Sequence, residues 1–410
     1  MSMFAGYAGY AGYAGYAGYA GYAGYAGYAS SAGIGGLTND MSQPLVADAL
    51  IRSRDAIYVP IGTVNKGPAD TQWLPSKKWT DASSKDHVAD FPAFGEVPGR
   101  LWQWEPVVRA ALFDTEFFGQ LEFVTTPEIE QLELRSRLAP TKYIARLVRP
   151  GRDKFLAQLG LVESWATRRE ERLPEIMTQM LPQVPFWAAI MNLRPDRNRY
   201  TFELIETALR FTMVIVMRFK HTLACPRPIE YSPNIQPMIL TPGYSTLPSG
   251  HATESAVAAH LMLALTGQGT GSPLEGQLLR LADRIAEHRV VAGLHFPIDS
   301  AAGYLLGRAL ASYIVALVHV APTEPGSAEA PVDYSGVFFD AAKYPDSGDW
   351  SHSNLDTSTR KEVEFAKTSS VKLWPSKRKT AKVATPFRPA PLLTQLWERA
   401  RAEQRDAGFV

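Results

Sequence analysis

Residues 152–320 constrain the fold most, because apolar side chains recur there at the spacing of long helices. The pattern forms three stripes: Phe202, Ile205, Leu209 and 211–216; Leu278, Leu281 and Ile285; and 304–318. The last stripe is apolar almost all round, which is typical of a helix that is buried on every side. The sequence therefore predicts a mainly α fold with a helical bundle core.

The regions on either side of this core contain more Pro, Gly and polar residues and show weak helical periodicity. We predict four parts: a low-complexity tail (1–33), a loop-rich N-terminal region that packs on the core (34–150), the helical core (151–322) and a C-terminal extension (323–410). Because 46% of the 410 residues are hydrophobic, the chain can bury a substantial core.

Local signals predict three elements in the flanking regions. Thr126 followed by Pro127 and two acidic residues indicates a helix start, so a helix should run from Pro127 to Leu138. Residues 120–125 should form a short strand, and residues 392–405 should form a last amphipathic helix.

Two segments point to contacts outside the core. Residues 5–28 are eight copies of Ala-Gly-Tyr, which is typical of a disordered tail, with self-association as the alternative. Residues 371–390 hold six basic side chains and no acidic one. Such a run is usually solvated surface, and docking on an anionic partner is the alternative.

Composition excludes several classes of protein. The net charge of +1 gives no overall attraction to nucleic acid, and the single cysteine, Cys225, excludes an intramolecular disulfide or a zinc site of paired thiolates. No apolar stretch reaches the roughly 20 residues that cross a membrane, since residues 301–320 include Arg308. No basic residue precedes Arg52, so a secretory signal is not expected and the predicted location is cytoplasmic.

Three segments of the helical core concentrate polar residues among apolar neighbours. In the first, a helix that ends near Ala224 presents Lys220, and Arg227 follows beyond a proline. Two cations that approach one point from different directions suit an oxyanion. The first segment therefore predicts half of an anion site.

In the second segment, Pro and Gly precede an apolar helical pattern, which places Ser249, Gly250 and His251 at a helix N-terminus. Free backbone N–H groups and the helix dipole favour an anion there. Ser249 can add a hydroxyl donor, and a glycine lets a ligand approach the backbone closely. His251 beside the bound group, with a pKa near the working pH, would suit a general acid.

In the third segment, Arg289 closes one helix and Pro297 opens the next. Asp299 lies four residues after His295, close enough to hydrogen-bond one ring nitrogen and leave the other free. An imidazole oriented in this way can act as a nucleophile or as a metal ligand.

Each segment alone is most often structural: a loop, a helix start and a hydrogen bond within a turn. Together they supply three cations, an anion-binding helix end, a candidate acid and an oriented imidazole within one bundle. This combination predicts an enzyme site for a tetrahedral or trigonal-bipyramidal anion.

The succession Lys-x6-Arg-Pro, Pro-Ser-Gly-His and Arg-x5-His-x3-Asp resembles the signature of the type 2 phosphatidic acid phosphatase superfamily. That superfamily includes the bacterial class A acid phosphatases and the vanadium-dependent haloperoxidases. The resemblance covers residues 201–317 and implies a bundle of the acid phosphatase/vanadium haloperoxidase type. It assigns phosphoryl binding to Lys220, Arg227, Arg289, Ser249 and Gly250, attack on phosphorus to His295 oriented by Asp299, and leaving-group protonation to His251.

One position departs from the family pattern. The residue before Arg289 is usually Ser, and here it is His288. This larger, titratable side chain would alter the hydrogen bonding around Arg289, and we expect it on the helix surface or packed behind the site. Cys225 is expected to be a small packing residue, because nothing in the sequence supplies a base that would activate its thiol.

The resemblance leaves two activities open. A phosphatase would work through a phosphohistidine without a cofactor, whereas a haloperoxidase would hold vanadate at the same residues with His295 as the vanadium ligand. Only 37 residues separate His251 from Arg289, and His295 begins a His-Phe-Pro-Ile-Asp stretch with downstream glycines. Both features resemble the phosphatases, so a phosphate ester is the expected substrate. A non-catalytic scaffold is the third alternative, and a homo-oligomer is compatible with all three.

Overall fold

The computed structural model describes residues 52, 101–139, 142–180, 183–268, 271–319, 334–346, 371–373 and 390–408. The predicted tail (1–33) lies outside these residues, as does nearly all of the basic run. Internal contacts divide the chain into two units, Tyr25–Glu105 and a second that contains Pro106–Val410. The second unit holds every helix and strand discussed below.

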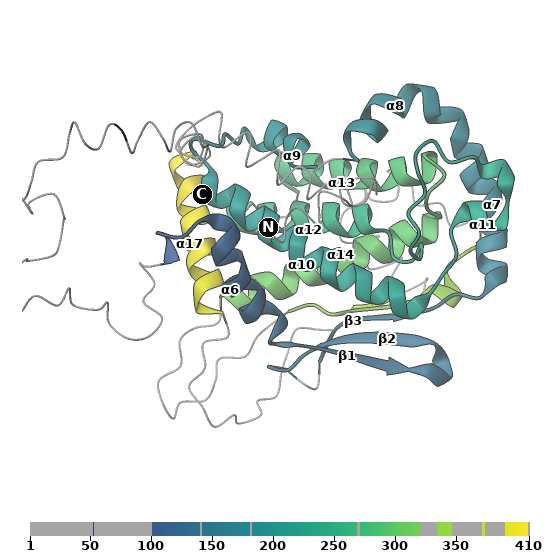
Figure 1. Cartoon of the computed structure of the whole chain (residues 1–410), viewed down its shortest axis with the longest axis horizontal. Helices are drawn as coiled ribbons and strands as arrows, with labels where there is room; N and C mark the ends of the chain where they lie inside the picture. The colour runs from purple at the N-terminus through teal and green to yellow at the C-terminus, as the bar shows by residue number, and fades with distance from the viewer. Residues whose placement is uncertain are drawn as a thin grey trace, which may run out of the picture. The chain divides into compact units, whose positions relative to one another are not determined.

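This unit is mainly α, as predicted (Figure 1). Its helices are α6 (Pro106–Phe118), α7 (Arg152–Trp165), α8 (Arg169–Thr178), α9 (Val184–Met191), α10 (Arg199–Leu223), α11 (Pro228–Tyr231), α12 (Gly250–Thr266), α13 (Pro273–Val291), α14 (Pro297–Val318) and α17 (Pro391–Asp406). Its strands are β1 (Leu121–Thr126), β2 (Gln131–Ser136), β3 (Tyr143–Val148), β4 (Val337–Asp340) and β5 (Val371–Leu373). The predicted last helix (392–405) is confirmed by α17, and the predicted strand (120–125) is confirmed by β1.

Helix α12 lies at the centre of the bundle, against α10, α13 and α14. Two glycines of α14 allow close contact with α12. A Cβ atom on Gly307 would lie 2.3 Å from the backbone oxygen of Thr253, and one on Gly303 would lie 2.6 Å from that of Ser249. Because this packing brings the starts of the two helices together, the Ser249 N–H donates to the Asp299 backbone oxygen at 2.9 Å.

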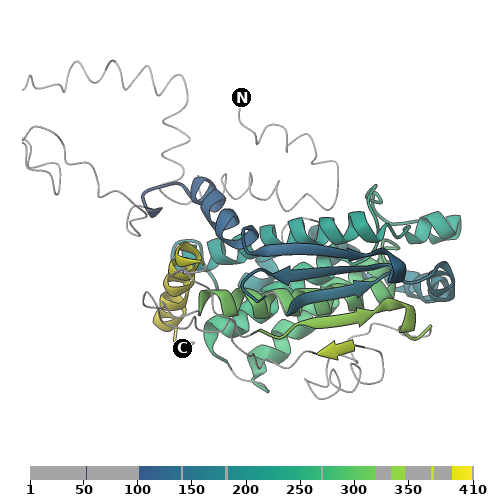
Figure 2. The ribbon, with the colours of Figure 1, turned by 90° about the horizontal axis from the view of Figure 1, so that it is seen from below.

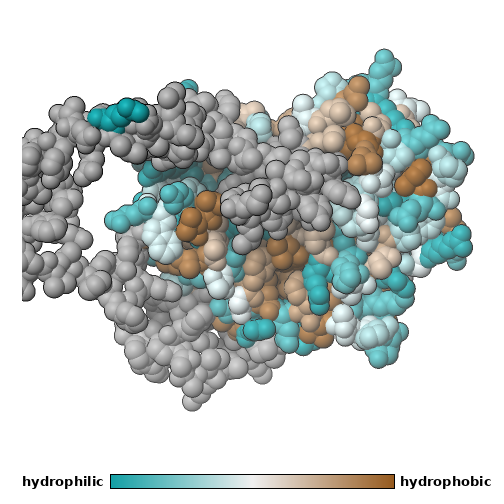
Figure 3. Space-filling model, in the orientation of Figure 1, coloured by the Kyte–Doolittle hydropathy of each residue, from teal (hydrophilic) through white to brown (hydrophobic). Residues whose placement is uncertain are grey.

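Among the helices that the structure describes, α14 alone is long and apolar enough to cross a membrane by length and composition. However, 83% of its most apolar window is buried inside the protein. Figure 3 shows brown surface in separate patches among teal side chains on the visible face. Leu173 and Met177, one turn apart on α8, are among the exposed apolar residues. The apolar length of α14 therefore serves the packing of the bundle.

A sheet lies against the bundle, as the turned view in Figure 2 shows. Its strand order is β1-β2-β3-β4-β5, with β3 and β4 parallel and the other neighbours antiparallel. The register pairs Phe123 with Leu134 across β1 and β2, and Ala145 with Val337 across β3 and β4. Residues 106–148, within the predicted N-terminal region, thus form α6 and three strands of this sheet.

The predicted helix from Pro127 to Leu138 is wrong. A single 3-10 turn, Pro127–Ile129, begins after Thr126, so the start signal does produce a helical turn. Glu130 then adopts a left-handed conformation with φ of 48°, and the chain reverses into β2. Pairing of β2 on both sides, with β1 and β3, outweighs the local preference for helix.

Candidate active site

His295, at the turn before α14, has both ring nitrogens engaged. Its Nδ1 lies 3.1 Å from Asp299 Oδ2, and its Nε2 lies 3.1 Å from an Nη atom of Arg227. Because a guanidinium can only donate hydrogen bonds, Nε2 must carry the lone pair and Nδ1 the proton. The predicted orientation of His295 by Asp299 is therefore present, and it selects one tautomer.

Asp299 is fully buried and accepts hydrogen bonds both from the start of α14 and from Thr246. Its Oδ2 accepts from the backbone N–H of Phe296 at 2.8 Å, which caps the start of α14, and from the hydroxyl of Thr246 at 2.5 Å. Burial raises the pKa of Asp299 to about 6, against the lowering effect of the Thr246 hydrogen bond. Thr246 Oγ1 is also 3.1 Å from His295 Nδ1, so threonine, aspartate and histidine form one cluster.

Lys220 and Arg227 reach this cluster from the C-terminal end of α10 and the turn that follows. Helix α10 ends at Leu223, with Ala224 left-handed at its C-cap, close to the predicted end. Lys220 Nζ donates to the backbone oxygens of Ser245 and Thr246, both at 2.8 Å. Arg227 donates to the backbone oxygens of Tyr244 (2.9 Å) and Leu294 (3.0 Å) as well as contacting His295.

Both side chains are almost completely buried. Burial, together with the positive charge of Arg227, holds the pKa of Lys220 well below its usual value. Burial likewise lowers the pKa of Arg227. Burying two positive charges here costs folding free energy unless a negative charge is buried with them.

The predicted helix N-terminus is confirmed, since α12 begins at Gly250 with Ser249 as its N-cap. The Ser249 hydroxyl oxygen accepts from the Ala252 N–H at 3.5 Å, which leaves its own proton for another acceptor. A Cβ atom on Gly250 would meet only Val216, at 4.0 Å. Packing within the described part of the chain therefore does not require a glycine at this position.

His251 follows on the first turn of α12, where its Nε2 lies 3.0 Å from the backbone oxygen of Gln179. A carbonyl oxygen only accepts, so Nε2 carries a proton and Nδ1 is left to exchange one. The expectation of a pKa near the working pH is not met. Burial, together with the charge of Arg289, lowers the pKa of His251 to about 3.

Arg289 lies in the last turn of α13 and is fully buried. Its Nη atom donates to the Ile176 backbone oxygen at 3.2 Å and lies 3.5 Å from Gln179 Oε1. Burial lowers the pKa of Arg289 to about 10, although the charge of Glu254 acts in the opposite direction.

His288 is fully buried, so its predicted place on the helix surface is wrong and the alternative, packing behind the site, is correct. Its Nδ1 lies 2.8 Å from Gln179 Oε1, the same oxygen that faces Arg289. Burial and the charge of Arg289 lower its pKa to about 3. His288 thus takes part in the hydrogen bonding next to Arg289 through Gln179.

The predicted site residues converge on one region. After burial, the charges of Arg227, Lys220, His251 and Arg289 all act to hold the pKa of His295 well below its usual value. The hydrogen bond between Ser249 and Asp299 joins the helix start to the same region. His295 is therefore a neutral imidazole, with a lone pair on Nε2, among three buried cations.

Cys225, which lies between Lys220 and Arg227 in the sequence, is buried. This agrees with the prediction that it is a small packing residue. Burial raises the pKa of its thiol to about 12, so the thiolate is scarce at neutral pH.

Thr246 and Gln179 are site residues that sequence reasoning missed. Thr246 lies three residues before Ser249, but a lone threonine gives no signal of a partner 53 positions away. Gln179 lies 72 positions before His251, in a region where the sequence shows only helical spacing.

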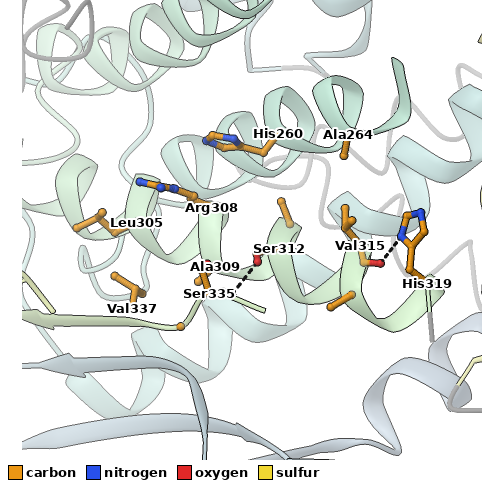
Figure 4. Close-up of a pocket in the computed structure, with 13 residues that line it drawn as sticks. His260, Ala264, Leu305, Arg308, Ala309, Ser312, Val315, His319, Ser335 and Val337 are labelled. Atoms are coloured by element: carbon orange, nitrogen blue, oxygen red, sulfur yellow. Dashed lines mark hydrogen bonds between the residues drawn. The ribbon is translucent and has the colours of Figure 1, made fainter. Parts of the chain in front are cut away.

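A separate cavity of about 410 Å³ lies farther along α12 and α14, where they face the start of β4 (Figure 4). The side chains of His260 and Arg308 lie near each other in the lining of this cavity. None of the predicted site residues lines it. Burial and the charge of Arg308 lower the pKa of His260 to about 3. The cavity and the cation cluster are distinct features of the same two helices.

No protein-family profile matches the chain. Over 82 residues it is 35% identical to the decaprenylphosphoryl-5-phosphoribose phosphatase of Mycobacterium tuberculosis, in strain CDC 1551 / Oshkosh and in strain ATCC 25618 / H37Rv. The match covers 20% of this chain and 42% of the length of each of these relatives. Over that stretch the chain is similar to a phosphatase, which is compatible with the superfamily resemblance and supports phosphate-ester hydrolysis at a coarse level.

Proposed function

We propose that the protein is a phosphatase that hydrolyses phosphate esters through a phosphohistidine on His295. The observation that carries the proposal is the pair of contacts on its ring, Nδ1 with Asp299 and Nε2 with Arg227. They present the Nε2 lone pair beside a cation that can bind a phosphoryl oxygen. The partial similarity to a phosphatase supports the same reaction class.

Three buried cations favour the binding of a phosphoryl group. Two carboxyls lie near the buried side chains of Lys220, Arg227 and Arg289. Burial raises the pKa of Asp299 only to about 6, so Asp299 is mostly ionised at neutral pH, whereas burial raises the pKa of Glu254 to about 8, so Glu254 is mostly neutral. A phosphoryl group with two negative charges would complete the charge balance. The Ser249 hydroxyl and the first backbone N–H groups of α12 add neutral donors to the same anion.

In the proposed first step, the Arg227 N–H turns from His295 Nε2 to a phosphoryl oxygen and the freed Nε2 lone pair attacks phosphorus. An N–P bond forms and the bond from phosphorus to the ester oxygen breaks. His251 Nδ1 gives its proton to that oxygen, so the leaving group departs as an alcohol. In the second step His251 Nδ1 takes a proton from water, the water oxygen attacks phosphorus, and the N–P bond breaks to release phosphate.

His251 must be protonated for the first step, although its pKa is about 3 in the structure. Burial is the largest cause of this low pKa, and the positive charges of Arg289, Lys220 and Arg227 lower it further. A bound phosphate ester would cancel much of that charge and raise the pKa of His251. The substrate itself therefore helps to place the proton on the acid.

Vanadate has the same shape and charge as the transferring phosphoryl group, so the same residues fit it. His295 Nε2 would be the vanadium ligand, the three cations would hold the oxygens, and bound vanadate would supply activation of peroxide for halide oxidation. Since the curated relatives are phosphatases, hydrolysis is the activity we propose and halide oxidation is an outcome of the test.

The test uses the full chain with p-nitrophenyl phosphate, and then with orthovanadate, peroxide, bromide and a phenol dye. We expect hydrolysis of the ester, inhibited by orthovanadate, and no bromination. Bromination without hydrolysis would establish the haloperoxidase instead. Neither activity, together with assembly that depends on residues 1–33, would favour the scaffold alternative.

A further inference from the structure

Gln179 occupies the C-cap of α8 and is fully buried between α8, α12 and α13. It contacts three residues around the cation cluster. Its backbone oxygen accepts from His251, and its side-chain Oε1 faces His288 (2.8 Å) and Arg289 (3.5 Å). One residue therefore joins the candidate acid to one of the phosphoryl-binding cations.

The other side-chain atom of Gln179, the amide Nε2, is buried and has no hydrogen-bond partner within the described part of the chain. Buried amide donors are normally paired, because an unpaired one has lost its water without replacement. This donor belongs to the same planar group as Oε1, so it lies next to Arg289. Arg289 Nε is also buried without a partner there.

We propose that the side-chain amide of Gln179 is a further binding group for the substrate phosphoryl, donating to one of its oxygens beside Arg289. This inference rests on the proposed phosphatase function. It gives α8 a direct part in the site, and it gives His288 a role as the residue that holds the amide with its NH₂ toward the anion.

The orientation of the amide follows from its neighbours. Arg289 can only donate, so the side-chain oxygen of Gln179 faces it, and the Nδ1 atom of His288 then carries the proton that Oε1 accepts. A serine in place of His288 has a shorter side chain and would not reach the amide in the same way. The amide and the histidine are therefore expected to work as a pair.

Helix α8 is firmly attached, as a binding group requires. Arg169 at its start donates to the backbone oxygens of Val291 (3.0 Å), Ile235 (2.8 Å) and Gln236 (2.9 Å). The part-exposed ion pair of Glu175 with Arg284 of α13, at 2.5 Å, adds stability to this attachment but is not needed to place the amide. The amide is thus placed by contacts that do not involve the ligand.

A purely structural role would make Gln179 only a link between α8 and α13. Two variants separate the roles. Gln179→Glu keeps the shape and the oxygen that faces His288, but replaces the NH₂ donor by an oxygen. Arg284→Gln removes the ion pair of α8 with α13 and changes no residue that contacts the Gln179 side chain, so it is the matched control.

The experiment measures inorganic phosphate binding by calorimetry and p-nitrophenyl phosphate kinetics on wild type, Gln179→Glu, Gln179→Ala and Arg284→Gln. A hydrogen bond to a charged group corresponds to about a 10- to 100-fold change in affinity. We expect phosphate Kd and KM to rise by that factor in both Gln179 variants. Arg284→Gln should lower Tm and leave Kd unchanged.

Two results would overturn the inference while leaving the phosphatase intact: Gln179 variants that bind phosphate as tightly as wild type, or Arg284→Gln weakening binding as much as they do. If Gln179→Glu fails to fold, Gln179→Ala decides between these outcomes by the Tm increase that phosphate causes. A wild-type protein that neither binds phosphate nor hydrolyses the ester would remove the proposed function, and this inference with it.

Discussion

Three residues determine the chemistry of His295: Arg227, Asp299 and Thr246. Arg227 can only donate to Nε2, so Nε2 carries the lone pair, and Asp299 accepts a hydrogen bond from Nδ1–H. The Thr246 hydroxyl donates to Asp299 and so favours its charged form. Since burial raises the pKa of Asp299 to about 6, the state of this carboxyl changes close to neutral pH.

Thr246→Val tests this arrangement. Removing the donor takes away an effect that lowers the pKa of Asp299, so the pKa rises above about 6 and the carboxyl becomes neutral at a higher pH. The acid limb of the kcat/KM profile should therefore move to higher pH. Thr212→Val, which removes a buried hydroxyl bonded within α10, is the control and should leave the profile in place. An unchanged or downward-shifted limb in Thr246→Val would contradict the assignment.

His251→Ala tests the general acid. Such catalysis contributes about 10²- to 10⁴-fold, and it matters most for poor leaving groups. We expect an alkyl phosphate to lose that factor in kcat, while p-nitrophenyl phosphate loses much less. The exposed His221 of α10 provides a control variant, His221→Ala, with unchanged rates. Equal losses on both esters would mean that His251 does not protonate the leaving group.

Among the individual site residues, the sequence predicted those whose partners are close along the chain or that lie in a recognisable motif. His295 with Asp299, and Ser249 at a helix start, are such cases. Thr246 and Gln179 could not be predicted, because their roles depend on backbone and side-chain positions brought together only by folding. The low pKa of His251 was missed for the same reason, since it depends on burial and on Arg289.

Among the elements, the contact between α12 and α14 places the site. It brings Ser249 beside Asp299, and it depends on the absence of side chains at Gly303 and Gly307. The sequence showed these glycines only as part of a family-like stretch. Their physical role became clear from the 2.3 Å that would separate a Cβ on Gly307 from the Thr253 oxygen.

Gly307→Ala should force the two helices apart. Overpacking of a tight core costs about 1–3 kcal/mol of unfolding free energy, and the separation should also lower phosphatase activity. Gly276→Ala in α13 meets nothing within 4 Å and is the matched control. It should be neutral or stabilise by up to about 1 kcal/mol, as expected for Ala over Gly in a helix. Urea denaturation of both variants gives the comparison, and equal stabilities would contradict this role of Gly307.

Helical segments were predicted well where a stripe of apolar residues runs for several turns, as in α10, α13, α14 and α17. The segment 127–138 was not, because its helix-start signal is local whereas its strand depends on β1 and β3. The parallel pairing of β3 with β4 joins residues about 190 positions apart, and no short-range pattern encodes it.

At the scale of the whole molecule, α17 ties distant parts of the chain to the bundle. Its Glu403 accepts from the backbone N–H groups of Tyr200 (3.0 Å) and Thr201 (2.9 Å), at the start of α10. The start of α17 is held in turn by Glu116 of α6, which accepts from Leu392 and Leu393. The starts of α10 and α17 are thus capped by side chains of other helices, α17 and α6, rather than by their own neighbours.

Glu403→Ala should leave two N–H groups of α10 without their partner. Loss of a helix cap costs about 0.5–2 kcal/mol, so the urea midpoint should fall. Glu398→Ala, an exposed position on the same helix, should change it little. If the two variants were equally stable, the C-terminal helix would not cap α10 in solution.

The most direct test of the central claim is covalent capture. A ³²P-labelled ester is mixed with the enzyme, the reaction is quenched with base within milliseconds, and the labelled peptide is sequenced by mass spectrometry. We predict a base-stable, acid-labile phosphoryl group on His295 that is absent from His295→Ala. Label on another residue, or wild-type hydrolysis by His295→Ala, would contradict the account.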